Sequence, residues 1–98
     1  MMKKLPEDAL RTLYETVLKL ETVEECDAFF EDICTIKELQ DLSQRLQVAM
    51  LLNEGKNYQE VSAITGASTA TICRVNKCLM YGNGYRSVLP QNGKDDAE

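Results

Sequence analysis

Residues 66 to 77 read GASTATICRVNK, and this stretch decides which fold the chain is expected to adopt. Gly66 can take the positive φ angle that a tight turn between two helices requires. Ser68 is a preferred helix N-cap, and apolar side chains recur after it at helical spacing. A short predicted helix, YQEVSAIT, precedes the glycine from residue 58 onward. The stretch therefore predicts the second helix of a helix-turn-helix.

The helix-turn-helix prediction depends on side chains that would hold the two helices together. The first helix needs an apolar anchor and a small residue facing the second helix, which needs apolar residues on its inner face. Thr65 departs from this pattern, because a bulky aliphatic residue is commoner there, and we expect Ile64 to supply it. An ordinary helical hairpin is the alternative. The positions that fit are Val61, Ser62, Gly66, Ala67, Ile72 and Val75, with Leu79 one turn further.

The outer face of the predicted second helix carries small side chains and two cations. Hydroxyl groups can donate to or accept from base edges in the major groove, and methyl groups can contact the methyl of thymine. β-Branched residues are poor helix formers, so they are unusual on a helix that only faces solvent. Simple coverage of an exposed helix is the alternative. The residues expected to point outward are Thr69, Ala70, Thr71, Cys73, Arg74 and Lys77.

Charge is unevenly distributed along the chain. The whole sequence of 98 residues has a net charge of −5. Residues 1–54 hold six basic and twelve acidic side chains, whereas residues 55–94 hold five basic and one acidic, a net charge of +4. DNA responds to local potential within a Debye length of about 8–10 Å. The charge around the helix-turn-helix, and not the net charge of the whole chain, therefore determines whether DNA is attracted. The alternative is that these loops lack acids by accident. We expect modest, steeply salt-dependent affinity for DNA.

Helix start and stop signals recur along the rest of the chain. A hydroxyl or amide followed three residues later by glutamate predicts N-caps at Thr22, Thr35 and Asn57. Gly55 and Gly66 are expected to end the helices before them. The sequence predicts an all-α fold of five to six helices. Its expected parts are one domain over residues 1–90, with dimerisation helices in 1–54 and the helix-turn-helix in 57–79, and a disordered acidic tail in 91–98.

Several classes of function are not expected. The chain has no histidine, no glycine-rich phosphate loop and no serine or cysteine beside an evident base, so it is not expected to be an enzyme. No apolar run approaches the roughly 18 residues of a membrane span, and the N-terminus turns acidic where a signal peptide needs its apolar core. We expect a cytoplasmic protein with no membrane partner and no cofactor. The four cysteines form no C-x-x-C pair, which favours reduced packing thiols over a redox or metal site.

From about Leu42 to Leu79 the sequence resembles the Trp repressor superfamily, and more narrowly its YerC/YecD branch. The resemblance is carried by the pair Leu51-Leu52, by GASTATICR from residue 66, and by residues 76–79. It implies an intertwined homodimer with two heads, roughly 34 Å apart, that bind a palindromic site on double-stranded DNA. By position it implies base contacts by Thr69, Ala70, Thr71 and Cys73, and phosphate contacts by Gln59 and Ser68.

The resemblance departs from the family at the co-repressor pocket, where two arginines clamp tryptophan. Arg74 matches the second arginine, but the first falls on Gln44, with Arg45 one residue away and roughly 100° around the helix. Cys78 replaces a serine that helps to hold the amino group of the ligand. A clamp with one guanidinium loses part of its charge-assisted pairing with a carboxylate. We therefore expect an effector other than tryptophan, or none.

Together these observations predict a transcriptional regulator, most simply a repressor, that binds DNA as a homodimer. The residues support the dimer independently of the resemblance. The amphipathic stripes exceed what one small monomer core needs, and the adjacent Phe29 and Phe30 cannot share one helix face. The alternative function is a dimeric helical module that kept the fold but binds a basic protein through its acidic half.

Overall fold

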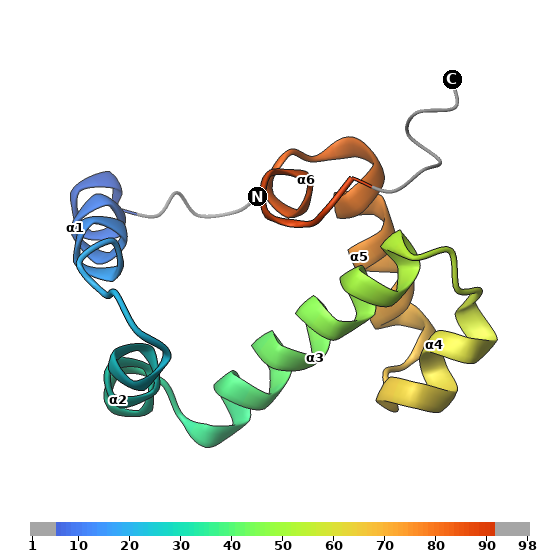
Figure 1. Cartoon of the computed structure of the whole chain (residues 1–98), viewed down its shortest axis with the longest axis horizontal. Coiled ribbons are helices and arrows are strands. Elements are labelled where there is room, and N and C mark those ends of the chain that lie inside the picture. The colour runs from blue at the N-terminus through green and yellow to red at the C-terminus, as the bar shows by residue number, and fades with distance from the viewer. Residues whose placement is uncertain (1–5, 92–98) are drawn as a thin grey trace. The chain divides into compact units, whose positions relative to one another are not determined.

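The computed structural model describes residues 6–91 of the chain, and all its regular elements in that range are helices (Figure 1). This confirms the all-α fold class. The predicted tail lies outside the described residues except for Gln91. The six helices of the described range are α1 (Glu7–Val17), α2 (Val23–Ile33), α3 (Ile36–Asn53), α4 (Tyr58–Thr65), α5 (Thr69–Tyr81) and α6 (Gly84–Val88).

The chain forms two compact units, which we call the N-terminal unit (residues 1–39) and the C-terminal unit (residues 40–98). The boundary between them falls within α3, so that helix begins in one unit and continues into the other. The N-terminal unit contains α1, α2 and the first turn of α3. The C-terminal unit contains the remainder of α3 and the helix-turn-helix, which is formed by α4 and α5.

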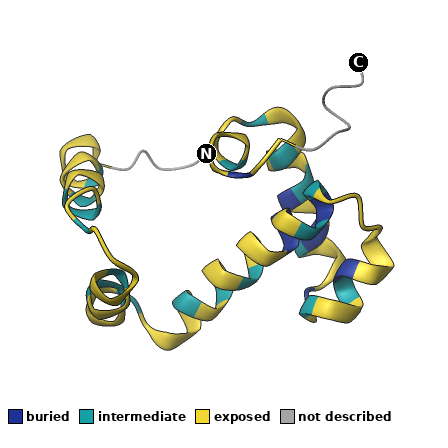
Figure 2. Ribbon diagram, in the orientation of Figure 1, coloured by how far each residue is buried: buried dark blue, intermediate teal, exposed yellow. Residues whose placement is uncertain are grey.

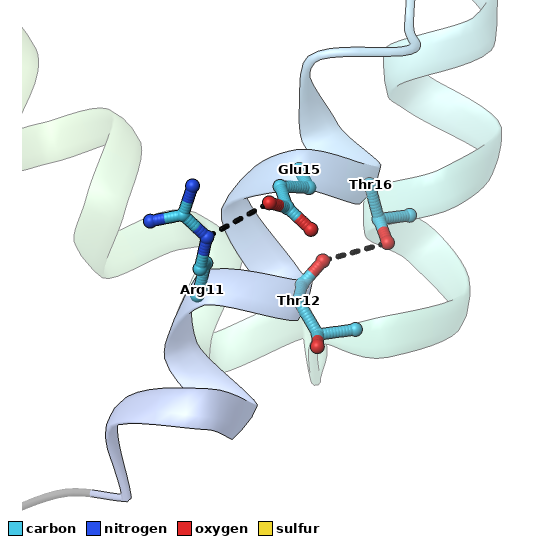
Figure 3. A network of polar contacts seen from close by, with 4 residues as sticks. All are labelled: Arg11, Thr12, Glu15 and Thr16. Atoms are coloured by element: carbon cyan, nitrogen blue, oxygen red, sulfur yellow. Dashed lines mark hydrogen bonds and ion pairs between the residues drawn. The ribbon is translucent and has the colours of Figure 1, made fainter.

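Helix α1 begins directly after Pro6, with Glu7 and Asp8 in its first turn, where negative charge is favourable. Its surface carries an ion pair between Nε of Arg11 and Oε2 of Glu15 at 2.9 Å (Figure 3). Nearby, the hydroxyl of Thr16 donates to the backbone oxygen of Thr12 at 2.8 Å. Both groups of the ion pair are exposed, so this pair adds little to the stability of the helix.

The two predicted caps in the N-terminal unit are present. At the start of α3, the Thr35 hydroxyl accepts from the Glu38 N–H at 3.1 Å, and the Glu38 carboxylate accepts from the Thr35 N–H at 2.8 Å. At the start of α2, Thr22 accepts from the Glu25 N–H, but the Glu25 carboxylate accepts from the N–H of Glu21, one residue earlier. Each arrangement satisfies two backbone donors that the helix itself cannot.

The N-terminal unit leaves much apolar surface uncovered. No residue of α1 or α2 is buried, although each helix has an apolar stripe. Leu18 is 81% exposed and Ile36 is 76% exposed. Phe29 and Phe30 are half-buried, and their rings meet edge to face with centroids 5.4 Å apart. Two short helices without a buried side chain do not form a stable core by themselves.

The core of the C-terminal unit lies where the end of α3 meets α4 and α5 (Figure 2). Leu79 is half-buried and packs against this core. These positions confirm the inner face that the sequence predicts for the helix-turn-helix. The buried residues are Val48, Ala49 and Leu52 from α3, Val61 from α4, Ala67 from the turn, Ile72 and Val75 from α5, and Leu89 after α6.

The turn between α4 and α5 has the predicted geometry but not the predicted apolar residue. Gly66 has a φ angle of +76°, which favours glycine. The expectation for Ile64 is wrong, because its side chain is 53% exposed. Thr65 is half-buried in its place, and its hydroxyl donates to the Val61 oxygen and accepts from the Ala67 N–H. A hydrogen-bonded threonine thus replaces the usual aliphatic side chain.

The end of α5 is held by an arginine. Arg86 donates from Nε to the Leu79 oxygen at 3.2 Å and from Nη2 to the Met80 oxygen at 2.6 Å. These carbonyls belong to the last turn of α5, and the last carbonyl groups of a helix have no backbone N–H partner within the helix. Arg86 is therefore committed to stabilising this helix end.

No helix within residues 6–91 is both long enough and apolar enough to cross a membrane.

We predict that Ile72→Ala lowers the free energy of unfolding by about 2–5 kcal/mol, because the removed atoms leave a cavity in the core. Ile72 is only 1% exposed. Urea denaturation followed by circular dichroism measures the change. The matched control is Ile64→Ala, which should cost about 0.5 kcal/mol or less because it removes the same atoms from a surface side chain. Equal losses at the two positions would contradict the assigned inner face.

Candidate nucleic-acid interface

The candidate interface is the outer side of α5, the second helix of the helix-turn-helix. Ile72 and Val75 turn inward and are buried. Successive residues of a helix are about 100° apart, so the opposite side carries a different set of side chains. All members of this set are exposed, and we call it the reading face. It consists of Ala70, Cys73, Arg74 and Lys77.

The first turn of α5 divides the predicted contact residues into two groups. Thr69 is exposed beside the reading face. Thr71 is half-buried, and its hydroxyl accepts from the Ser68 hydroxyl at 3.2 Å. Ser68 also caps α5, because its oxygen accepts from the Thr71 N–H at 3.2 Å. The predicted Ser68 and Thr71 therefore form a structural pair at the edge of the surface.

A shallow hollow of about 370 Å³ lies where α4 and α5 begin. Its lining brings together Gln59 and Thr69, two residues that sequence reasoning places at DNA, with Ser62 and Ala63. The hollow also includes Tyr58, which sequence reasoning missed. One sequence feature could have indicated Tyr58: it directly follows the N-cap Asn57. The ring of a tyrosine carries a hydroxyl group and can remain partly exposed at such a position.

The cations of the C-terminal unit are not equally available. Arg86 is engaged with the carbonyls at the end of α5. Arg74 and Lys77 are exposed, and neither makes an ion pair or a hydrogen bond with any residue in the range 6–91. Their charges are therefore free to act on a ligand at the reading face. Phosphate oxygens and the acceptor edges of guanine are groups that such cations bind.

The four residues of the predicted effector pocket occupy different environments. Gln44 is half-buried and donates from Nε2 to the backbone oxygen of Thr65 at 3.2 Å. Arg45 and Arg74 are exposed. Cys78 lines a hollow of about 520 Å³ that includes Leu46 and Tyr85 but neither arginine. The Gln44 amide is therefore occupied by the protein itself, and the hollow beside Cys78 is largely apolar.

The cysteines form no disulfide in the described part of the chain. All four are free thiols; Cys26 and Cys34 are half-buried, whereas Cys73 and Cys78 are exposed. Within residues 6–91, no group of three cysteine, aspartate or glutamate side chains is arranged to hold a metal ion.

Comparisons with known proteins point to one family. Residues 8–92 match the family described as Trp repressor protein. The chain is 52% identical over 96 residues to the uncharacterised protein YerC of Bacillus subtilis, covering 97% of this chain and 92% of that one. Two solved structures are similar at 43% identity. One is a Staphylococcus aureus protein provisionally assigned as a Trp repressor (TM-score 0.80; 93% and 89% of the two chains), and the other a TrpR-like protein from Eubacterium eligens (TM-score 0.79; 86% and 94%).

We predict that Ser68→Ala lowers the free energy of unfolding by about 1 kcal/mol, because the first turn of α5 loses its side-chain cap. Thermal and urea denaturation measure the loss. Ser43→Ala is the matched control, since Ser43 is exposed within α3 and alanine is the better helix former. The control chain should be as stable as the unaltered protein or slightly more so. A Ser68→Ala chain of unchanged stability would show that the cap is not needed.

Proposed function

Because the chain belongs to the Trp repressor family, we propose that it is a sequence-specific DNA-binding transcriptional regulator, acting as a repressor. In this proposal α5 enters the major groove of a palindromic site. Ala70 and Cys73 contact base edges together with Thr69, while Arg74 and Lys77 contact phosphates or guanine. Gln59, Ser68 and Tyr58 lie toward the phosphate backbone.

One observation carries this proposal: the reading face combines small exposed side chains with two cations that the protein does not pair within residues 6–91. An exposed cation that only serves solubility is commonly accompanied by acids on the same helix, and α5 has no acidic residue. The small side chains Ala70 and Cys73, which precede the cations along α5, let the helix backbone approach the bases closely. This combination fits a polyanion with a groove better than it fits a flat protein surface.

We further propose that the regulator is a homodimer. In the N-terminal unit, α1 and α2 have apolar stripes but no buried residue. In the C-terminal unit, Leu42, Leu46 and Met50 form a second stripe along α3 at four-residue spacing, and each is between 43% and 47% exposed. A second copy would remove this surface from water. Two reading faces related by a two-fold axis then match a palindrome.

The proposed effector differs from tryptophan, the ligand after which the family is named. The Gln44 amide is bound to Thr65, and Arg45 is exposed one position further around the helix. A carboxylate ligand would therefore find one available guanidinium, that of Arg74, instead of a pair. We propose an effector other than tryptophan, or regulation without a small molecule.

The alternative function is a dimeric helical module that binds protein. The specific observation in its favour is the acidic character of residues 1–54, which suits a basic partner. Selection of sites from a random DNA library, with and without amino acids in the buffer, separates the two functions. A regulator enriches a palindrome, whereas a protein-binding module enriches no sequence.

We predict that the double substitution Arg74→Ala/Lys77→Ala abolishes retardation of the selected DNA. At low salt, where residual binding is measurable, the plot of log affinity against log salt concentration should become shallower by about 0.9 for each phosphate that the protein no longer neutralises. The matched control is Arg11→Ala/Lys19→Ala, which removes the same two residue types from α1 and the residues after it. The control chain should retain its affinity. Normal retardation by the Arg74→Ala/Lys77→Ala chain would disprove the assignment of α5.

We predict that light scattering gives a mass of twice the 11.1 kDa chain. Leu42→Glu should lower this mass toward one chain, because it places a charge in the apolar stripe of α3 that a partner would cover. Ile64→Glu is the control, since Ile64 has similar exposure but lies on the outside of α4. A mass of one chain for the unaltered protein would refute the dimer.

A further inference from the structure

Gln44 joins the long helix to the helix-turn-helix at a point away from the core. The core residues of α3 are Val48, Ala49 and Leu52, all in the second half of the helix. Gln44 lies one turn earlier, about 6 Å along the helix axis. From there its Nε2 donates to the backbone oxygen of Thr65, at the end of α4. This bond adds to the core packing and to the connection through residues 54–57 that already hold the helix-turn-helix to α3.

A hydrogen bond outside the core restricts the angle between the helix-turn-helix and α3 more tightly than apolar packing does. Core packing at Val48, Ala49 and Leu52 holds the helix-turn-helix against α3, and apolar contacts are not directional. The hydrogen bond to Thr65 is directional, and it acts at a distance from that packing. It therefore opposes rotation of α4 and α5 relative to α3 with little change in the buried apolar surface.

The hydrogen bond reaches α5 through a rigid turn. The Thr65 hydroxyl accepts from the Ala67 N–H at 3.0 Å, and the Ser62 hydroxyl donates to the Ala67 oxygen at 3.2 Å. Ser68, the next residue, caps α5. Because the turn is held from both sides, a displacement of the Thr65 carbonyl moves the start of α5 with it.

We propose that Gln44 is a positioning residue that sets the distance between the two half-sites the protein accepts. This inference rests on the proposed function as a DNA-binding dimer. Helix α5 has 13 residues and is therefore roughly 20 Å long. Ile72 and Val75 anchor the middle of this helix in the core, so a rotation of about 10° about that contact moves Lys77, roughly 7.5 Å beyond Ile72, by roughly 1.3 Å. The rise of one base pair is about 3.4 Å. In a two-fold dimer both heads move, so the effect on spacing doubles.

The test uses the full-length chain and DNA in which two selected half-sites are separated by spacers of every length. Gln44→Leu removes the donor and keeps a side chain of similar size. It should enrich spacings on both sides of the preferred one and weaken binding at the preferred spacing by about 2- to 10-fold, the range that one neutral hydrogen bond carries. Gln47→Leu, the same substitution at an exposed position of α3, is the matched control and should keep the original spacing.

Two further measurements separate positioning from stability. Affinity for DNA with a single half-site should be unchanged by Gln44→Leu, because one head needs no spacing; a loss there would show a structural role and overturn the proposal. Gln44→Lys, which can donate to the same carbonyl, should restore the original spacing. If the leucine chain fails to fold, Gln44→Asn replaces it, since its shorter amide cannot reach Thr65, and the same broadening is expected.

The outcomes also distinguish this inference from the proposed function. If the unaltered chain enriches no DNA, the function as a DNA-binding regulator is wrong. If the unaltered chain enriches one palindrome and the Gln44→Leu chain enriches the same palindrome with the same single spacing, the function stands and the role of Gln44 is wrong.

Discussion

The position of the reading face depends on one small apolar cluster in which Val48 and Ala49 of α3 meet Val61 of α4 and Ile72 of α5. Each of these side chains is at most 1% exposed. Alanine allows the helices to approach closely, and the β-branched residues have few rotamers to lose on burial. Because the cluster contains few residues, each contributes a large share of the packing that orients α5. The exposed side of α5 is set by what its buried side contacts.

The fold therefore has a complete core in one unit and an incomplete one in the other. In the C-terminal unit, side-chain hydroxyl groups form hydrogen bonds with backbone groups of the turn between α4 and α5. Among the described residues, no buried side-chain nitrogen or oxygen is without a partner. The N-terminal unit has well-formed caps, but its apolar stripes are uncovered. Local signals are sufficient to start and stop a helix, whereas burial requires a second surface. This contrast is the physical reason for proposing that the chain functions as a dimer.

The sequence predicted best what depends on neighbouring residues. The caps at Thr22, Thr35, Asn57 and Ser68 and the left-handed Gly66 are local, and all were predicted because a side chain three residues away, or the absence of one, decides them. The inner face of the helix-turn-helix followed from helical spacing. Helical spacing did not predict that Thr65, and not Ile64, takes the half-buried position before the turn. The hydrogen bonds of Thr65 compensate for its lack of apolar area.

Contacts between distant segments were beyond sequence reasoning. The Gln44 bond to Thr65 joins residues 21 positions apart, and no local pattern indicates it. The hollow that adds Tyr58 to Gln59 and Thr69 likewise forms only when the starts of α4 and α5 lie together. The reading face itself was predicted as a set of residues, but the division between free side chains and the Ser68–Thr71 pair required the geometry of the cap.

That division has an evolutionary consequence. Ser68 and Thr71 serve the fold, so most changes at these positions weaken the helix before they can alter what it contacts. Ala70 and Cys73 are exposed and make no side-chain hydrogen bond that the fold needs within the described residues. Substitutions there can change the chemistry presented by the helix at almost no expense of stability. Under the proposed function, relatives with this scaffold can therefore diverge in target preference at such exposed positions, while the buried Ile72 and Val75 and the Ser68–Thr71 pair stay under structural constraint.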